Sequence, residues 1–174
     1  AWIVEGVVAA EDGPTLSGLF TGGEQVQCTV TPNDGEADGA TMSSNTVTMN
    51  NPPVLGTVSL NTLAPAEGDT LEATISSSSD ADGDAVSLQY AWYVNETMTA
   101  ATDTLSSASF DKGDVIRVQI TPHDGIDAGA TVVSANAIAQ NTAPVVHVVS
   151  LDASELYTSD TLAATVSSSD VDGD

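Results

Sequence analysis

The sequence repeats itself with a period of 90 or 91 residues, and this repetition constrains the fold more than any other feature. Phe20–Gly39 reads FTGGEQVQCTVTPNDGEADG, and Phe110–Gly129, 90 residues later, reads FDKGDVIRVQITPHDGIDAG. The segment DTLEATISSSSDADGD from Asp69 recurs as DTLAATVSSSDVDGD from Asp160, 91 residues later. Several matches in one order indicate a tandem repeat.

These matches divide the chain into three parts. Residues 51–140 form one complete repeat, residues 1–50 match the second part of a repeat, and residues 141–174 match the opening part of another. We expect the chain to be a window from a longer repetitive protein.

Within the complete repeat, short segments in which apolar and polar residues alternate predict β-strands separated by turns. Leu71, Ala73 and Ile75 share one face of a predicted strand. Ile116, Val118 and Ile120 lie on the face opposite Val115, Arg117 and Gln119 in another. The predicted strands cover 54–60, 70–76, 87–94, 115–121 and 131–138, with one or two short strands between 95 and 109. About seven strands in about 90 residues predict an all-β fold, a Greek-key β-sandwich.

Composition excludes several functions. The chain has 25 Asp or Glu residues against 2 Lys or Arg, a formal net charge of −23. This charge excludes electrostatic binding to nucleic acid or to an anionic membrane surface. No apolar run of about 18 residues is present, so no segment is expected to insert into a membrane. The lone Cys28 cannot form an intrachain disulfide.

Two acidic loops point to metal binding. Asp80, Asp82 and Asp84 place three carboxylates in five residues, and Asp170, Asp172 and Asp174 repeat them. Carboxylates this close repel one another unless a cation neutralises them, and hard oxygen ligands in a flexible loop suit Ca²⁺. Neither loop contains Cys or His, which argues against zinc and copper. The pattern is not an EF-hand, because its glycine comes at position 4 and Ala91 stands at position 12.

The order of four motifs resembles the immunoglobulin-like and cadherin-like tandem repeats of large bacterial or archaeal surface and secreted proteins. The motifs are N-x-(A/P)-P-V at 50–54, S-S-D-x-D-G-D at 78–84, A-W-x-V at 91–94 and T-P-x-D-G at 121–125. Trp92 and Trp2 match the tryptophan that immunoglobulin domains bury in their core. The resemblance implies immunoglobulin-like β-sandwiches and an extracellular or cell-surface location.

The same resemblance implies where further metal ligands come from. In an immunoglobulin-like topology the acidic loop, the T-P-x-D-G turn and the linker lie at one end of the domain, and the turns of the preceding domain face them. A cation shared at such a junction would stiffen it, as in cadherins. Beyond the two acidic loops, the expected ligands are Asn51, Asp124, Asn141, Asp34, Asp69 and Asp114, with Glu67, Asp111 and Glu24 in the same turns.

Simpler interpretations remain open. Asp and Gly are common turn residues, so the acidic loops could be solvated turns, and a turn explains Asp124 and Asp34 equally well. High acidity could also reflect adaptation to high salt. Trp2 and Trp92 could form a platform for sugar binding instead of core positions. Asn95-Glu96-Thr97 is a glycosylation sequon, and exposed Ser and Thr could carry further glycans.

The sequence contains no catalytic motif, so we expect a protein that is not an enzyme. The predicted function is that of a calcium-stiffened stalk, fibre or cell-surface filament whose partners are neighbouring repeats or copies of the same protein. One alternative is the spacer of an adhesin whose distal domain binds sugar or protein, and another is an accessory domain of an enzyme. A further alternative is strand complementation, in which the opening strands of one chain complete the partial repeat of the next.

Overall fold

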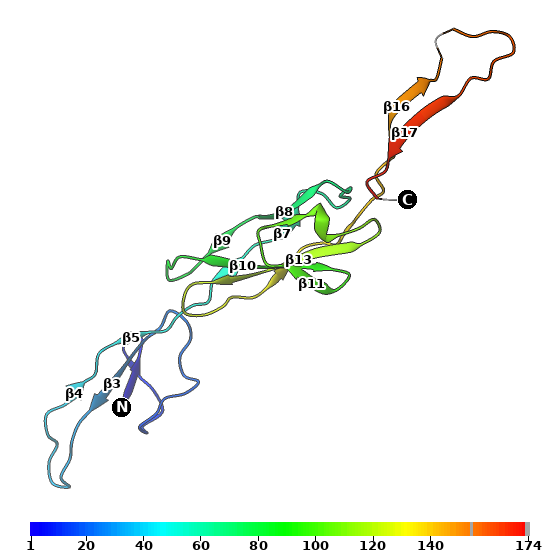
Figure 1. Cartoon of the computed structure of the whole chain (residues 1–174). Helices are drawn as coiled ribbons and strands as arrows, with labels where there is room; N and C mark the ends of the chain where they lie inside the picture. The colour runs from blue at the N-terminus through cyan, green and yellow to red at the C-terminus, as the bar shows by residue number, and fades with distance from the viewer. Residues whose placement is uncertain (154, 173–174) are drawn as a thin grey trace. The chain divides into compact units, whose positions relative to one another are not determined.

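The computed structural model describes residues 1–153 and 155–172, and its fold is all-β with several antiparallel sheets, an arrangement consistent with a β-sandwich (Figure 1). A single turn of 3-10 helix, η1 (Ser107–Ser109), is the helical element among these residues. Within the described part of the chain, no helix has the length and hydrophobicity that a bilayer crossing requires.

Contacts divide the chain into two compact units. The first contains residues 1–56, 77–89 and 121–131, and the second contains 57–76, 90–120 and 132–174. Each unit is described separately.

The first unit is organised around one sheet with the strand order β2-β1-β3-β4, in which β5 also pairs with β3. Glu5 and Gly6, both with positive φ (48° and 77°), make the tight turn between its first two strands. A separate ladder joins β6 to β9. The strands are β1 (Trp2–Val4), β2 (Val7–Val8), β3 (Gln25–Val30), β4 (Met42–Ser43), β5 (Val47–Thr48), β6 (Val54–Leu55) and β9 (Ser78–Ser79).

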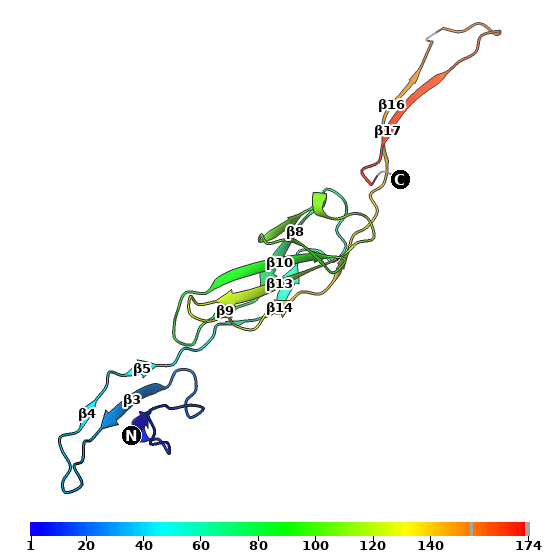
Figure 2. The ribbon, with the colours of Figure 1, turned by 60° about the horizontal axis from the view of Figure 1, so that its bottom comes forward.

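The second unit contains a three-stranded sheet of order β12-β8-β7 and most of a larger sheet of order β11-β10-β13-β14, in which β15 also pairs with β13. Strands β16 and β17 form a separate hairpin ladder (Figure 2). The strands are β7 (Val58–Leu60), β8 (Thr70–Ile75), β10 (Ser87–Val94), β11 (Thr97–Ala100), β12 (Thr104–Ser106), β13 (Val115–His123), β14 (Val132–Val133), β15 (Ala137–Ile138), β16 (Val145–Leu151) and β17 (Ala164–Ser169).

The core of the second unit takes side chains from both of its sheets. Trp92 on β10 is 0% exposed, and its Nε1–H donates to the carbonyl of Thr102 at 2.8 Å, which satisfies its polar group. The other core side chains are Val58, Leu71, Leu105, Phe110, Ile116, Val118, Ile120, Ala137 and Ala139. Each fully buried Leu or Ile side chain contributes about 1.5–3 kcal/mol relative to an exposed one.

Several sequence predictions are confirmed. Strand 87–94 has the predicted bounds, and strand 70–76 ends one residue early, at Ile75. Along β13 the side chains of Ile116, Val118 and Ile120 are buried and the residues between them are half-buried, as the alternation predicts.

Two predictions of continuous strands are wrong. Segment 54–60 is split into β6 and β7, and segment 131–138 into β14 and β15. In each case a serine hydroxyl replaces a backbone partner: Ser76 Oγ accepts the Thr57 N–H at 2.8 Å, and Ser134 Oγ accepts the Val118 N–H at 3.1 Å. Local side-chain bonds of this kind compete with the strand ladder.

Candidate metal centres

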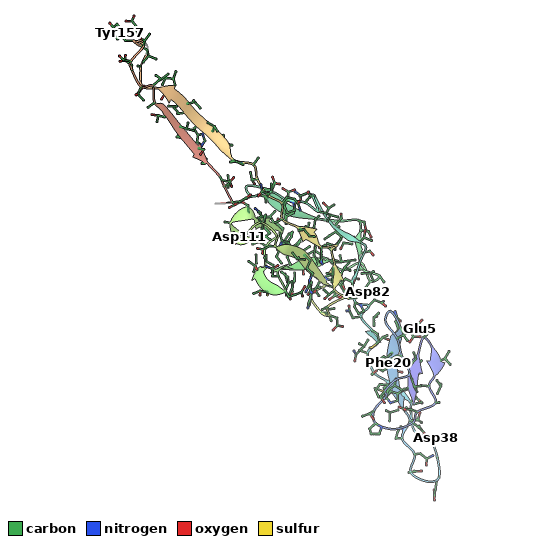
Figure 3. The ribbon with its side chains drawn as sticks, turned by 90° about the vertical axis from the view of Figure 1, so that its right-hand side faces the viewer. Glu5, Phe20, Asp38, Asp82, Asp111 and Tyr157 are labelled. Carbon is green, nitrogen blue, oxygen red and sulfur yellow. The ribbon has the colours of Figure 1, made fainter. Side chains whose placement is uncertain are left out.

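The first acidic loop connects β9 to β10 within the first unit, and Asp82 in it is labelled in Figure 3. Asp80, Asp82 and Asp84 each offer a carboxylate oxygen, and these oxygens lie within 4.8 Å of one another. Asp80 Oδ1 accepts the backbone N–H groups of Asp82 at 2.8 Å and Asp84 at 3.3 Å. Gly83 completes the turn with a φ of +85°, a conformation that a side chain disfavours. The loop therefore folds back around Asp80.

The second carboxylate oxygen of Asp80 is the unusual atom of this loop. Asp80 Oδ2 is buried and accepts no hydrogen bond from the described residues. Burying an anionic oxygen without a partner is unfavourable, and most such oxygens have a donor or a cation beside them. This atom and its neighbouring carboxylates fit a hard cation.

Two asparagines of the linker hold two different segments: Asn51 bonds to the acidic loop, and Asn50 bonds to the turn that contains Asp124 and Asp127. The backbone N–H of Asn51 donates to Asp82 Oδ2 at 2.6 Å, and its side-chain amide donates to Asp82 Oδ1 at 3.0 Å. Asn50 Nδ2 donates to Asp124 Oδ2 at 2.8 Å and to Asp127 Oδ2 at 3.4 Å. The structure thus brings Asp82 and Asp124 to the same short linker segment.

Asp124 is a well-satisfied anion in the T-P-x-D-G turn. Its side chain is fully buried, and Oδ1 accepts the N–H groups of Ile126 and Asp127, both at 2.7 Å. The hydrogen bond from Asn50, followed by the backbone hydrogen bonds, lowers the pKa of Asp124 to about 2. A cleft of about 280 Å³ opens beside these groups and is lined by Thr48, Met49, Asn50, Asp82, Asp84 and Ile126.

The second acidic loop, in the second unit, repeats two hydrogen bonds of the first. The Asp172 N–H donates to Asp170 Oδ1 at 2.9 Å, and Asp172 Oδ2 accepts the backbone N–H of Thr142. Asp172 Oδ1 is buried and accepts no hydrogen bond from residues 1–153 and 155–172. The predicted ligand Asp174 lies outside the described residues.

Further carboxylates gather at this second loop. Side-chain contact with Asp172 raises the pKa of Glu67, and the charges of Asp172, Asp111 and Asp170 add to the effect. Two facing carboxylates must share a proton or a cation. The Thr142 N–H is the largest cause that lowers the pKa of Asp172, and the charge of Lys112 contributes. The backbone N–H of Thr142 and the charge of Lys112 therefore offset part of the negative charge of this loop.

The remaining predicted ligands close local turns. Asp34 Oδ1 accepts the N–H groups of Glu36 and Ala37, both at 2.9 Å, and these backbone bonds lower its pKa. Asp69 Oδ2 accepts the Ala66 N–H at 2.9 Å. Asp114 accepts from Asn95 Nδ2 at 2.6 Å and from the Asp111 N–H at 2.8 Å. Asn141 Nδ2 donates to the Thr142 carbonyl at 3.0 Å. None of these hydrogen bonds joins one of the four residues to an acidic loop.

Sequence reasoning missed Asn50 and Thr142. Asn50 is the first position of the N-x-(A/P)-P-V motif and recurs at Asn141, so the repetition of the motif could have identified it. Thr142 acts through its backbone N–H, for which a sequence carries no signal.

Comparisons with protein-family models, with curated proteins and with solved structures found no match to this chain.

Proposed function

We propose that this chain belongs to an extracellular structural protein in which calcium ions, bound by the acidic loops, stiffen the junctions between immunoglobulin-like repeats of a stalk, fibre or cell-surface filament. The repeat period and the all-β fold support the repeat architecture, and the burial of Trp92 supports the likeness to immunoglobulin domains.

One observation carries the calcium proposal. Asp80 Oδ2 is buried without a donor among the described residues, next to two further carboxylates within 4.8 Å. A cation at this loop would satisfy that oxygen and relieve the repulsion between the three side chains. The oxygen-only donor set favours Ca²⁺ over zinc or copper.

Stiffening follows from the bonds between the loop and the linker. Asp82 belongs to the candidate cation site and also accepts two hydrogen bonds from Asn51. A cation that orders Asp82 therefore also orders the backbone of Asn51. In an array whose mechanics depend on the contacts between neighbours, ordering this segment limits bending at the junction.

The test is a calcium titration of the whole 174-residue chain after treatment with EDTA, followed by calorimetry and by thermal unfolding. Ligand binding to the folded state alone raises the free energy of unfolding, by about 2.7 kcal/mol when calcium is at 100 times its Kd. Asp80→Asn should weaken the calorimetric binding. Asp103→Asn, which removes the same charge from an exposed position outside both loops, is the matched control.

Heat of binding that disappears in Asp80→Asn and persists in Asp103→Asn would support the proposal. A chain whose unfolding temperature is the same in calcium and in EDTA would overturn it. So would equal binding by the two variants, because the calcium would then be a diffuse counterion to the acidic surface.

A further inference from the structure

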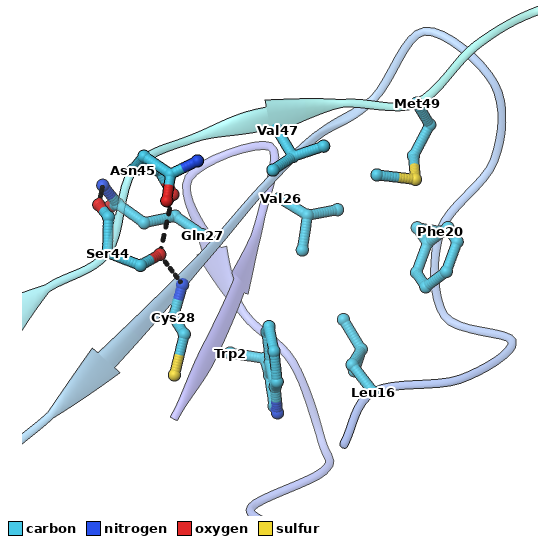
Figure 4. A pocket seen from close by; sticks show the side chains of 10 residues that line it. All are labelled: Trp2, Leu16, Phe20, Val26, Gln27, Cys28, Ser44, Asn45, Val47 and Met49. Carbon is cyan, nitrogen blue, oxygen red and sulfur yellow. Dashed lines mark hydrogen bonds between the residues drawn. The ribbon is translucent and has the colours of Figure 1, made fainter. Parts of the chain in front are cut away.

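The turn formed by residues 21–24 lies against the linker that joins the first partial repeat to the complete one. Gly23 in this turn has a φ of +82°, and its N–H donates to the Met49 carbonyl at 2.8 Å. Phe20, which precedes the turn, and Met49 both line the apolar pocket of the first unit (Figure 4). Apolar contacts and a backbone hydrogen bond therefore fix this turn beside the linker.

The complete repeat forms the same turn at residues 111–114, beside the second linker at 141–144. Gly113 in it has a φ of +87°, and its N–H donates to the Ala139 carbonyl at 2.9 Å. In both turns the carboxylate of the fourth residue accepts the N–H of the first, at 2.6 Å in the first turn and 2.8 Å in the second. Lys112 in the second turn is therefore the structural equivalent of Gly22 in the first.

These two equivalent positions differ together with the linker residues beside them. Gly22 lies directly against Asn51, because a Cβ at position 22 would overlap Asn51 Oδ1 and would lie 2.8 Å from Asn51 Cγ, closer than Cβ atoms approach other groups. In the next copy of this arrangement Lys112 takes the place of Gly22, and the shorter Thr142 takes the place of Asn51. The larger turn residue thus accompanies the smaller linker residue.

This double difference changes what surrounds the middle aspartate of each acidic loop. Asn51 gives Asp82 two hydrogen bonds, from its backbone N–H at 2.6 Å and from its neutral side-chain amide at 3.0 Å. Asp172 accepts the backbone N–H of Thr142, which is the largest cause that lowers its pKa, and the charge of Lys112 lowers it further. The second loop therefore interacts with an ammonium group at a position where the first turn has a glycine.

We propose that Lys112 is a built-in counter-cation of the second acidic loop and lowers the calcium requirement of the second linker, whereas Gly22 gives the first linker no such group. This inference rests on the calcium-binding function proposed above and adds that the two linkers depend on calcium to different degrees. An ammonium group beside carboxylates stabilises their ionised forms, and it repels a divalent cation that binds to the same carboxylates. Lys112 therefore stabilises the metal-free loop and weakens its binding of calcium.

Two backbone amides report on the two loops separately. The Asn51 and Thr142 N–H groups each donate to the middle aspartate of their own loop. Hydrogen exchange of the whole 174-residue chain in EDTA measures how well each metal-free loop holds its linker. A calcium titration that follows the NMR shifts of the same two amides gives the calcium midpoint of each loop.

Lys112→Gln removes the ammonium group from an exposed turn position, so the variant should fold as the wild type does. In EDTA the Thr142 amide should exchange about threefold faster, the effect of one exposed charge pair. The calcium midpoint at this amide should fall about tenfold, because calcium carries twice the charge of a monovalent cation. Arg117→Gln, which removes the same charge from a side chain paired with Glu96, is the control and should change neither quantity.

The reverse change tests the proposal at the first linker, which the complete repeat follows. Gly22→Lys is combined with Asn51→Thr, because a side chain at position 22 would overlap the Asn51 amide. Compared with Asn51→Thr alone, the double variant should protect the residue-51 amide about threefold more in EDTA. Its calcium midpoint should be about tenfold higher.

These outcomes decide the proposal. Equal Thr142 exchange rates and equal calcium midpoints in Lys112→Gln and Arg117→Gln would overturn it, and so would a double variant that matches Asn51→Thr alone. Failure of the proposed function is a different result, in which calcium shifts neither amide of the wild-type chain. The calcium part of this proposal would then fall with it, and exchange in EDTA would still show whether Lys112 neutralises the second loop.

Discussion

The carboxylate of Asp82 accepts two hydrogen bonds from Asn51, one from the backbone N–H at 2.6 Å and one from the side-chain amide at 3.0 Å. In the next repeat the carboxylate of Asp172 accepts the backbone N–H of Thr142. The middle aspartate of each acidic loop thus holds the segment between repeats by its backbone. These hydrogen bonds form without a metal.

Asp82→Asn should release the linker even without calcium. The side-chain amide of the new asparagine has one oxygen and one NH₂ group, so it can accept only one of the two hydrogen bonds that Asn51 donates to Asp82. Loss of the other hydrogen bond should lower the free energy of unfolding by about 1 kcal/mol. Hydrogen exchange in EDTA should show the Asn51 amide exchanging about fivefold faster, the ratio that about 1 kcal/mol implies. Asp84→Asn removes an exposed carboxylate of the same loop and should leave this amide unchanged. Equal exchange rates in both variants would contradict the role given to Asp82.

Asn50→Ala should raise the pKa of Asp124 from about 2 toward its ordinary value of 3.8, because the Asn50 amide is the largest cause of the lowering. A lowered folded-state pKa contributes stability that is present above pH 3.8 and is lost as the pH falls through about 2. The acid-induced loss of stability between those values should therefore be shallower in Asn50→Ala than in the wild type.

Carboxyl NMR of the intact chain in EDTA measures the pKa of Asp124 directly. Asn136→Ala, which truncates an exposed asparagine elsewhere, is the control and should leave the titration unchanged. An unaltered Asp124 titration in Asn50→Ala would show that the turn backbone alone holds the carboxylate ionised.

Glu67→Gln should stabilise the metal-free chain at pH 7. Contact with Asp172 raises the pKa of Glu67, so its ionised form is disfavoured in the folded state and ionisation above pH 4.5 weakens folding. The gain in the free energy of unfolding should appear in EDTA at pH 7 and vanish below pH 4.5. Glu72→Gln, on the exposed side of β8, is the control. A destabilised Glu67→Gln in EDTA would mean that Glu67 does not face the Asp172 carboxylate.

Trp92→Ala should destabilise the chain far more than Trp2→Ala, although the two residues occupy the same place in the repeat. Trp92 is fully buried, so its truncation should cost about 3–5 kcal/mol. Trp2 is half-buried, and its truncation should cost about 1–2 kcal/mol. Urea unfolding at low protein concentration, followed by the remaining tryptophan, measures each. Similar costs would contradict the difference in burial between the two tryptophans.

The strands of the complete repeat could be predicted from the sequence to the extent that their residues alternate. Ile116, Val118 and Ile120 are buried because successive side chains of a strand point to opposite faces, which is a local property. The breaks at Thr57 and Ser134 could not be predicted, because a serine hydroxyl interrupts a ladder only where the neighbouring strand brings an N–H group to it. The extension of β13 to His123 depends in the same way on pairing.

The candidate site was predictable in its composition but not in its connections. The recurrence of three aspartates marked the two acidic loops, whereas Asp34, Asp69 and Asp114 bond to backbone N–H groups in their own turns or to Asn95. Asp82 and Asp84 stand beside a glycine in the sequence, as Asp34, Asp69 and Asp114 do. Only the tertiary structure shows which aspartates bond within their own turn and which bond to a distant segment of the chain.

By itself the sequence determined the periodicity of this protein, its all-β character and the identity of its buried faces, because these depend on spacing along one segment. Tertiary structure decided that Asp82 meets Asn51 across 31 positions, that Asp80 Oδ2 is buried without a donor in the described chain, and that Val47 remains exposed where Ala137 is buried. Those outcomes require distant segments to meet, and a carboxylate, a backbone N–H group or an apolar face acquires its role only from the group that reaches it.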